Sequence, residues 1–313
     1  MYIAEPEIRG VLTYATLIPA IREALIDYAC GRVEQPPRTI MRAGNAEGVN
    51  NGWFAVMPAI AGDVMGVKTV TFYPGNTGLS LPTHMATVEL LRRATGEPLA
   101  VMDGRLITEM RTAAVSAVAF AALAPLHFEV PPTSLGILGS GVQGRAHIEA
   151  FREVWPELRE IRIWSRTEAH AQRFADEIGA QAVGVEEAAS AEVVLTVTSS
   201  NEPVLQGRWL APHAMVLAVG ATGATMRELD DETMRTAFVV AESRSCVERE
   251  SGDVRLSCAT VEAEIGQILS GAIQTTIPRN RRVVFKSVGM AIEDVTAARL
   301  VWQARNSSQP RPI

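Results

Sequence analysis

The apolar residues of the first hundred positions follow two different periods. Between residues 16 and 30 they recur at helical spacing after Thr16, a residue suited to an N-cap, which predicts one amphipathic helix. Later, short apolar runs at 53–57 and 66–72 alternate with turns that contain proline and glycine, such as Pro74-Gly75. This alternation predicts a mixed or antiparallel sheet.

A hairpin and a buried helix are predicted after this sheet. The apolar runs 99–102 and 106–107 flank Asp103-Gly104, a dipeptide typical of a tight turn. An alanine-rich segment at 112–123 then predicts a helix, and Pro131-Pro132 follows it. We expect a new domain to begin near this break.

The rest of the chain alternates short apolar strands with helical segments, as a doubly wound sheet requires. Strands are predicted at 135–138, 161–164, 193–197, 215–219, 238–240 and 283–285, and helices at 262–269 and 291–303. We therefore predict an α/β fold in which residues 116–287 form a doubly wound parallel sheet of the Rossmann type. Residues 1–115 and 288–313 form a second, mixed-sheet α+β domain, with a loosely ordered tail from residue 306.

Composition and charge exclude several classes of protein. The 313 residues include 29 basic and 35 acidic ones without a long basic run, so we expect no nucleic-acid partner. Three scattered cysteines, Cys30, Cys246 and Cys258, suit neither a disulfide framework nor a metal site, and we expect buried thiols in a reducing compartment. The first ten residues lack the apolar core of a signal peptide, and the apolar run at 112–126 is too short for a bilayer. These features predict a cytoplasmic protein that does not enter a membrane.

A glycine-rich turn follows the strand predicted at 135–138. Gly139 makes the tight turn, Gly141 lets backbone amides approach a pyrophosphate, and Gly144 lets the following helix pack against the strand. The helix that starts near Val142 points its positive end at the phosphates. We therefore expect a nicotinamide dinucleotide to bind here, in contact with residues 139–143, namely Gly139, Ser140, Gly141, Val142 and Gln143.

The end of the second strand predicts which dinucleotide binds. NAD-selective sites carry an acidic residue there, but this chain has Ser165-Arg166-Thr167. A guanidinium between two hydroxyls suits a 2′-phosphate, so we predict NADPH over NADH, with NADH possible. The alternative is that Arg166 is a solvated loop residue and Thr167 a helix cap. Thr198 and Ser199, after the strand at 193–197, lie where such sheets bind cofactor, although strand-end caps have the same pattern.

Several blocks in both halves of the chain occur in the same order in one known family, and the chain resembles the ornithine cyclodeaminase and mu-crystallin family over nearly its whole length. The blocks are Pro36-Pro37-Arg38-Thr39, Val56-Met57-Pro58, the run from Gly66 to Tyr73, the run from Met110 to Ser116, the glycine turn, Arg227-Glu228-Leu229-Asp230 and the run from Phe285 to Met290. The resemblance implies a homodimer in which the second domain binds substrate and mediates dimerisation. It also implies that Gly220, Val288 and Gly289 contact the cofactor.

The resemblance further implies that basic side chains hold the carboxylate of a small amino or imino acid. The matching positions are Arg38, Lys68 and Arg111, and Arg42 is an alternative to Arg38. Both of those arginines could be surface charges, whereas Lys68 lies in an apolar strand, where an unpaired charge is costly. Lys68 therefore indicates either a function or an ion pair. His84 is a weaker candidate for a proton donor, since a lone histidine is more often structural.

Two departures from the family pattern point to the activity. Cyclodeaminases of the family use an aspartate as base where this chain has Thr222, and a glutamate where it has Ala55. The hydroxyl residue resembles the mu-crystallin branch, which is similar to ketimine reductases. A cyclic imino acid is already dehydrated, so hydride transfer to it needs no base for an amine.

We therefore expect NADPH-dependent reduction of a cyclic 2-imino acid, Δ1-pyrroline-2-carboxylate or Δ1-piperideine-2-carboxylate, to L-proline or L-pipecolate. Lys68, Arg111 and Thr222 are the expected catalytic residues, and no metal is required. Three alternatives stay open: an open-chain amino acid or N-alkyl amino acid dehydrogenase, an ornithine cyclodeaminase, and a non-catalytic mu-crystallin-like protein that binds NADPH.

Overall fold

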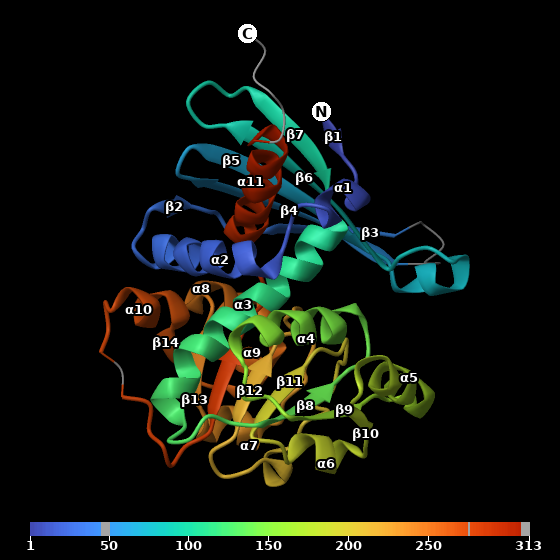
Figure 1. Cartoon of the computed structure of the whole chain (residues 1–313), viewed down its shortest axis with the longest axis vertical. Helices are drawn as coiled ribbons and strands as arrows, with labels where there is room; N and C mark the ends of the chain where they lie inside the picture. Colours follow the sequence, from blue (N-terminus) through green and yellow to red (C-terminus); the bar gives the residue numbers. More distant parts are fainter. Residues whose placement is uncertain (45–50, 275, 308–313) are drawn as a thin grey trace. The chain divides into compact units, whose positions relative to one another are not determined.

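The computed structural model describes residues 1–44, 51–274 and 276–307, which divide into two compact units (Figure 1). The first, the sheet unit, combines Met1–Arg111 with Met290–Ile313, and the second, the Rossmann unit, is Thr112–Gly289. The sheet unit holds a mixed sheet and the Rossmann unit a parallel one. The α/β fold class predicted from the sequence is therefore confirmed.

The sheet unit is built on antiparallel pairs, with one parallel pair at its edge. The strand order is β1-β7-β6-β5-β4-β2, and β3 also pairs with β4. The strands are β1 (Tyr2–Ile3), β2 (Val33–Glu34), β3 (Thr39–Ala43), β4 (Gly52–Ala61), β5 (Val64–Phe72), β6 (His84–Arg92) and β7 (Pro98–Asp103). The helices are α1 (Glu5–Arg9), α2 (Tyr14–Ala29), the 3-10 helix η1 (Pro74–Leu79) and α11 (Ala291–Ser307).

One face of this sheet is covered by the last helix of the chain. Along β5 the buried residues alternate, Val64, Gly66, Lys68 and Val70, as expected for a strand with one covered face. Figure 1 shows α11 lying across these strands, next to α2. A Cβ atom on Gly66 would lie 3.0 Å from a methyl carbon of Val295 on α11. The sequence therefore brings a C-terminal helix against an N-terminal sheet.

The hairpin predicted around Asp103-Gly104 is wrong, because a helix begins there. Helix α3 (Gly104–His127) starts directly after β7, and the Oδ1 atom of Asp103 accepts the N–H of Arg105 at 2.9 Å. The apolar residues Leu106 and Ile107 are buried on this helix. Gly104 is needed for packing, since a Cβ atom there would lie 2.8 Å from the Cβ of Ala86.

Helix α3 is also longer than the predicted segment at 112–123. By length and composition it could cross a membrane, so the expectation that this run is too short does not hold. However, 78% of its most apolar window is buried inside the protein, which is typical of a core helix.

The Rossmann unit is an eight-stranded parallel sheet with the order β10-β9-β8-β11-β12-β15-β13-β14. Its strands are β8 (Ser134–Leu138), β9 (Glu160–Trp164), β10 (Gln181–Ala182), β11 (Val193–Thr196), β12 (Met215–Ala218), β13 (Phe238–Ala241), β14 (Val261–Glu264) and β15 (Val283–Lys286). The chain order reverses between β8 and β11, and ligands of such sheets bind at the carboxyl ends of the strands beside this reversal.

Helices connect these strands, and the core lies between them and the sheet. They are α4 (Val142–Val154), α5 (Glu168–Ile178), α6 (Val185–Ala189), the 3-10 helix η2 (Gly207–Trp209), α7 (Asp231–Thr236), α8 (Arg244–Glu250), α9 (Gly252–Ser257) and α10 (Ile265–Ser270). The helix predicted at 262–269 is wrong in its first half, because residues 261–264 pair with β13 as an added strand. The tail expected to be loosely ordered lies largely outside the described residues.

The three cysteines differ from the expectation of buried thiols. Cys246 is buried, but Cys30 and Cys258 are exposed. Both exposed cysteines stand at the C-cap positions of their helices, Cys30 at the end of α2 and Cys258 at the end of α9.

Candidate active site

The glycine turn forms an open cradle at the carboxyl end of β8. Gly139 has a φ of +126°, and a Cβ atom there would lie 2.7 Å from the carbonyl oxygen of Val197. A Cβ atom on Gly144 would lie 2.9 Å from the ring of Phe174 on α5. Gly141, the N-cap of α4, is exposed and would have nothing within 4 Å of such an atom. The N-terminus of a 13-residue helix is thus open to an anion, as a dinucleotide pyrophosphate requires.

The residues expected to select the cofactor follow β9. The Ser140 hydroxyl donates to the Ser165 hydroxyl at 3.0 Å, which joins this loop to the glycine turn. Arg166 is exposed and has no ion-pair partner among the described residues. Thr167 occupies the N-cap position of α5 but makes no side-chain cap hydrogen bond. The hydroxyl of Thr167 is therefore not committed to capping this helix.

Thr198, Ser199 and Gly220 lie in the loops that follow β11 and β12. A buried carboxylate, Glu228, holds these loops: it accepts the N–H of Thr198 at 2.5 Å and the N–H of Gly220 at 2.8 Å. It also accepts the N–H of Ala221 at 3.1 Å. Burial raises the pKa of Glu228. Sequence reasoning placed Glu228 in a family block but gave it no role, because its partners come from two other loops.

A second set of buried charges supports the same edge of the Rossmann unit. Lys286, the last residue of β15, lies 3.0 Å from Asp253, and both are fully buried. Asp253 in turn accepts the N–H of Glu228 at 2.8 Å. Glu242 accepts the N–H groups of Val288 and Gly289, each at 2.9 Å. The backbone at three of the predicted cofactor positions, 220, 288 and 289, is thus fixed by buried carboxylates.

Thr222 lies in the loop after β12, two residues beyond Gly220. It is exposed, and its hydroxyl makes no hydrogen bond within the described chain. Thr222 is therefore available to a ligand.

The predicted basic residues Lys68 and Arg111 come together in the sheet unit through two acidic residues that sequence reasoning missed. Lys68, 2% exposed on β5, lies 2.7 Å from the Oδ2 atom of Asp294. Arg111 on α3 donates from Nε to the Oδ1 atom of Asp294 at 3.0 Å and from Nη1 to Glu293 at 2.6 Å. A buried lysine predicts a counter-ion, but nothing in the sequence indicated that it would come from α11.

The charges around Lys68 act on its pKa in opposite directions. Burial lowers the pKa of Lys68 to about 8, the Asp294 carboxylate raises it, and the guanidinium groups of Arg111 and Arg38 lower it. Arg38, in the segment before β3, is half-buried, whereas Arg42 on β3 is exposed. The charge of Arg38 therefore contributes to the electrostatics at Lys68.

His84 on β6 belongs to the same neighbourhood. Its ring centroid lies 4.5 Å from that of Phe72 on β5. Desolvation of the ring and the charge of Lys68 lower the pKa of His84. Both effects favour the neutral imidazole over the charged form.

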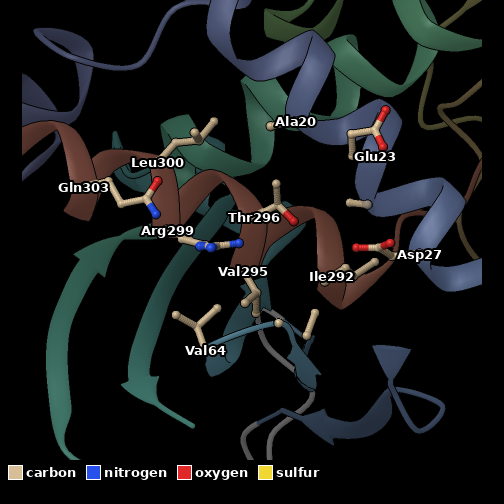
Figure 2. A pocket seen from close by; sticks show the side chains of 13 residues that line it. Ala20, Glu23, Asp27, Val64, Ile292, Val295, Thr296, Arg299, Leu300 and Gln303 are labelled. Atoms are coloured by element: carbon tan, nitrogen blue, oxygen red, sulfur yellow. The ribbon is translucent and has the colours of Figure 1, made fainter. Parts of the chain in front are cut away.

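A separate hollow of about 280 Å³ lies in the sheet unit between α2 and α11 (Figure 2). Arg299 of α11 and Asp27 of α2 reach it, above an apolar floor that includes Val64 and Val295. None of the site residues predicted from the sequence lines this hollow. Within the described residues, no group of three or more acidic, histidine or cysteine side chains could hold a metal ion.

Comparison with known proteins gives a consistent result over the whole chain. The family model described as "Ornithine cyclodeaminase/mu-crystallin family" matches residues 3–309. The chain is 40% identical to the ketimine reductase mu-crystallin of Mus musculus over 318 residues, which cover 98% of both chains.

Two solved structures are also similar. A Δ1-pyrroline-2-carboxylate reductase of Thermococcus litoralis, in complex with NADH and L-proline, has a TM-score of 0.89 and 30% identity and covers 98% of each chain. An archaeal alanine dehydrogenase dimer with bound NAD has a TM-score of 0.90 and 28% identity, over 98% of this chain and 96% of that one.

Proposed function

Because this chain belongs to the ornithine cyclodeaminase/mu-crystallin family, we propose that it reduces a cyclic 2-imino acid with NADPH. The substrate is Δ1-pyrroline-2-carboxylate or Δ1-piperideine-2-carboxylate, and the product is L-proline or L-pipecolate. The observation that carries this proposal is the buried cluster of Lys68 on β5 and Arg111 on α3, which meet at the carboxylate of Asp294. Ketimine and pyrroline-2-carboxylate reductases among the similar proteins support it.

The basic cluster suits the carboxylate and the nitrogen of such a substrate. Arg38 and Arg111 present planar guanidinium groups, which bind carboxylates in a fixed orientation. Lys68 carries an ammonium whose pKa of about 8 lets it give up a proton near neutral pH. We assign Arg38, rather than Arg42, to the substrate because Arg38 is half-buried and its charge acts on Lys68, whereas Arg42 is exposed.

The Rossmann unit would hold the dinucleotide at residues already described. The open N-terminus of α4 suits the pyrophosphate, and Arg166 with Ser165 and Thr167 suits a 2′-phosphate. The loops held by Glu228 and Glu242 form the nicotinamide side of the cradle. When bound, the nicotinamide supplies the hydride. Thr222 is free to hydrogen-bond the substrate nitrogen directly or through water.

The test is direct reduction by the purified protein. Consumption of NADPH with Δ1-pyrroline-2-carboxylate, and formation of proline, is expected. The variants Lys68→Ala and Arg111→Ala should lose this activity while they keep their affinity for NADPH, and Arg42→Ala should resemble the unaltered protein. Ammonia release from ornithine without net use of NADPH would instead support a cyclodeaminase, and binding of NADPH without turnover would support a carrier.

An open-chain amino acid dehydrogenase is the second candidate. The similarity to an alanine dehydrogenase structure favours it, and the same basic cluster suits any 2-imino acid. Consumption of NADPH with pyruvate and ammonia, but not with the cyclic imine, would establish this alternative.

We also propose that the protein is a homodimer, in which the open face of the sheet unit is the interface. Opposite the face that α11 covers, cross-strand rows place Met41, Phe54, Thr71 and Met85 side by side, and Pro58, Val67, Glu89 and Val101 form another row. Met41 is 47% exposed and Met85 41%. Exposed large apolar side chains that lie together on one sheet face are typical of protein interfaces. The archaeal alanine dehydrogenase is a dimer.

The proposed compartment is the cytoplasm. All three cysteines are free thiols, and two of them are exposed. Exposed free thiols persist where the surroundings are reducing. Fractionation of the cells that produce the protein would test this assignment.

A further inference from the structure

The protein uses lysine at only two of its 29 basic positions, Lys68 and Lys286, and arginine at the others. Both lysines are buried, and each pairs with one aspartate, Asp294 or Asp253. Arginine stays charged at any accessible pH, whereas a buried lysine can lose its proton near neutral pH. At Lys68 the chain therefore retains a cation that can titrate, in a protein that otherwise favours arginine.

The carboxylate of Asp294 joins this titrating cation to a permanent one. Its Oδ2 atom lies 2.7 Å from Lys68, and its Oδ1 atom accepts from Arg111 at 3.0 Å. Glu293, the preceding residue, contacts Arg111. Asp294 and Glu293 are both fully buried in the first turn of α11, where the helix dipole favours negative charge. The two acidic residues thus share Arg111 as a partner, and the ion pair with Lys68 is made by Asp294.

We propose that Asp294 is a positioning residue that fixes the Lys68 ammonium and keeps it protonated, so that Lys68 acts as the acid of the reaction. This inference rests on the proposed function and deepens it. Lys68 gives one proton to the imine nitrogen, and the imine carbon receives a hydride from NADPH, which is oxidised to NADP⁺. The C=N double bond becomes a CH–NH single bond, and neutral Lys68 then regains a proton from water.

The groups around Lys68 determine whether its pKa rises or falls when Asp294 is replaced. Those that face it from the packed elements are Asp294 of α11, Arg111 and Thr108 of α3, Arg38 before β3, and His84 of β6. Asp294 supplies the negative charge closest to Lys68, and the two arginines oppose it. Loss of that charge in Asp294→Asn should therefore lower the pKa of Lys68 and deprotonate it at a lower pH.

The small number of lysines makes this titration directly observable. Protein labelled with ¹³C at the lysine ε-carbon contains only two lysine signals to follow by NMR against pH, and Lys68→Met assigns them. In Asp294→Asn the titration midpoint of Lys68 should move down by about one pH unit or more, which is a tenfold lower proton affinity. Glu293→Gln is the matched control, because Glu293 contacts Arg111, and it should move the midpoint much less. The Lys286 signal should stay unchanged and report an intact fold.

Activity provides a second readout. The alkaline limb of the pH profile of kcat/KM should move with the NMR midpoint in Asp294→Asn and return toward its original position in Asp294→Glu. If Asp294→Asn does not fold, Lys68→Arg still tests the idea: it keeps the ion pair but cannot release a proton, so kcat should fall about 100-fold or more. Full activity of Lys68→Arg would overturn the proposal.

Assays of imine reduction and of the Lys68 midpoint distinguish an error in the role of Asp294 from an error in the proposed function. If the protein does not reduce the imine but the Lys68 midpoint moves as expected, the proposed function is wrong, but Asp294 does keep Lys68 protonated. If it reduces the imine and the midpoint is the same in Asp294→Asn as in the unaltered protein, the role of Asp294 is wrong.

Discussion

The carboxylate of Glu228 accepts the backbone N–H of Gly220 at 2.8 Å, and no larger residue fits at position 220. A Cβ atom there would lie 2.1 Å from the carbonyl oxygen of Thr198 and 2.6 Å from Glu228 itself. The loops after β11 and β12 are therefore packed backbone against backbone, with one carboxylate between them. This arrangement fixes the backbone of the loops at the predicted nicotinamide side of the cradle.

Glu228→Gln should lower the free energy of unfolding by about 2–4 kcal/mol, because an amide offers one acceptor oxygen instead of two and leaves buried N–H groups unpaired. The affinity for NADPH should fall in the same variant, since the loops lose their fixed geometry. Urea unfolding and titration with NADPH measure the two effects.

The control is Glu232→Gln, a nearby position on α7. Glu232 is 55% exposed and lies 3.8 Å from Arg282, so its loss should change the free energy of unfolding by less than about 1 kcal/mol. Equal effects of the two substitutions would contradict the role given to Glu228.

The burial of His147 predicts that the protein loses stability as the pH falls. It is fully buried on α4, and because a carbonyl oxygen can only accept, its Nδ1–H donates to Gln143 at 2.7 Å while Nε2 accepts from the Ser116 hydroxyl at 2.9 Å. Burial lowers the pKa of His147 to about 4. The unfolded chain, with its ordinary pKa near 6.5, takes up a proton first as the pH falls, so stability present above about pH 6.5 is lost toward pH 4.

The expected loss from this group is about 2 kcal/mol between roughly pH 7.5 and pH 5. His147→Gln should be less stable at neutral pH but should lose this part of the pH dependence. His170→Gln, at an exposed position on α5, should keep the full dependence. Denaturant unfolding at several pH values provides the measurement, and parallel pH curves for the His147 variant and the unaltered protein would refute the assignment.

The sequence predicted the features that are local and missed those that depend on tertiary contacts. The glycine turn, the family and the fold class follow from neighbouring residues and the order of motifs, and the family and fold are confirmed. The start of α3 was missed because Asp103-Gly104 has the signals of both a turn and a helix start. Asp294 was missed because it meets Arg111 across 183 positions of sequence, a distance over which spacing carries no information.

Arg166 tests the proposed preference for NADPH. Arg166→Asp removes a cation from the end of β9 and places there the charge that binds a ribose 2′-hydroxyl in NAD-selective sites. The ratio of kcat/KM for NADPH to that for NADH should fall by about 10- to 100-fold, the range expected for charge-assisted hydrogen bonds. The control is Arg173→Asp, at an exposed position of α5. It makes an equal change in net charge and should leave the ratio almost unaltered. An unchanged ratio in the Arg166 variant would exclude this residue from the 2′-phosphate site.

The open face of the sheet unit predicts how assembly can be disrupted. Val67 lies at the centre of that face on β5, between Pro58 and Glu89 in the neighbouring strands. It is not fully buried in a single chain, so Val67→Asp should fold, but a charge buried against a second sheet without a partner is costly. We expect the variant to sediment as a monomer at concentrations where the unaltered protein is a dimer. Leu256→Asp places the same charge at an apolar residue of the Rossmann unit that is 50% exposed, and it should leave the dimer intact. A monomeric unaltered protein, or a Val67 variant that remains dimeric, would show that this face is not the interface.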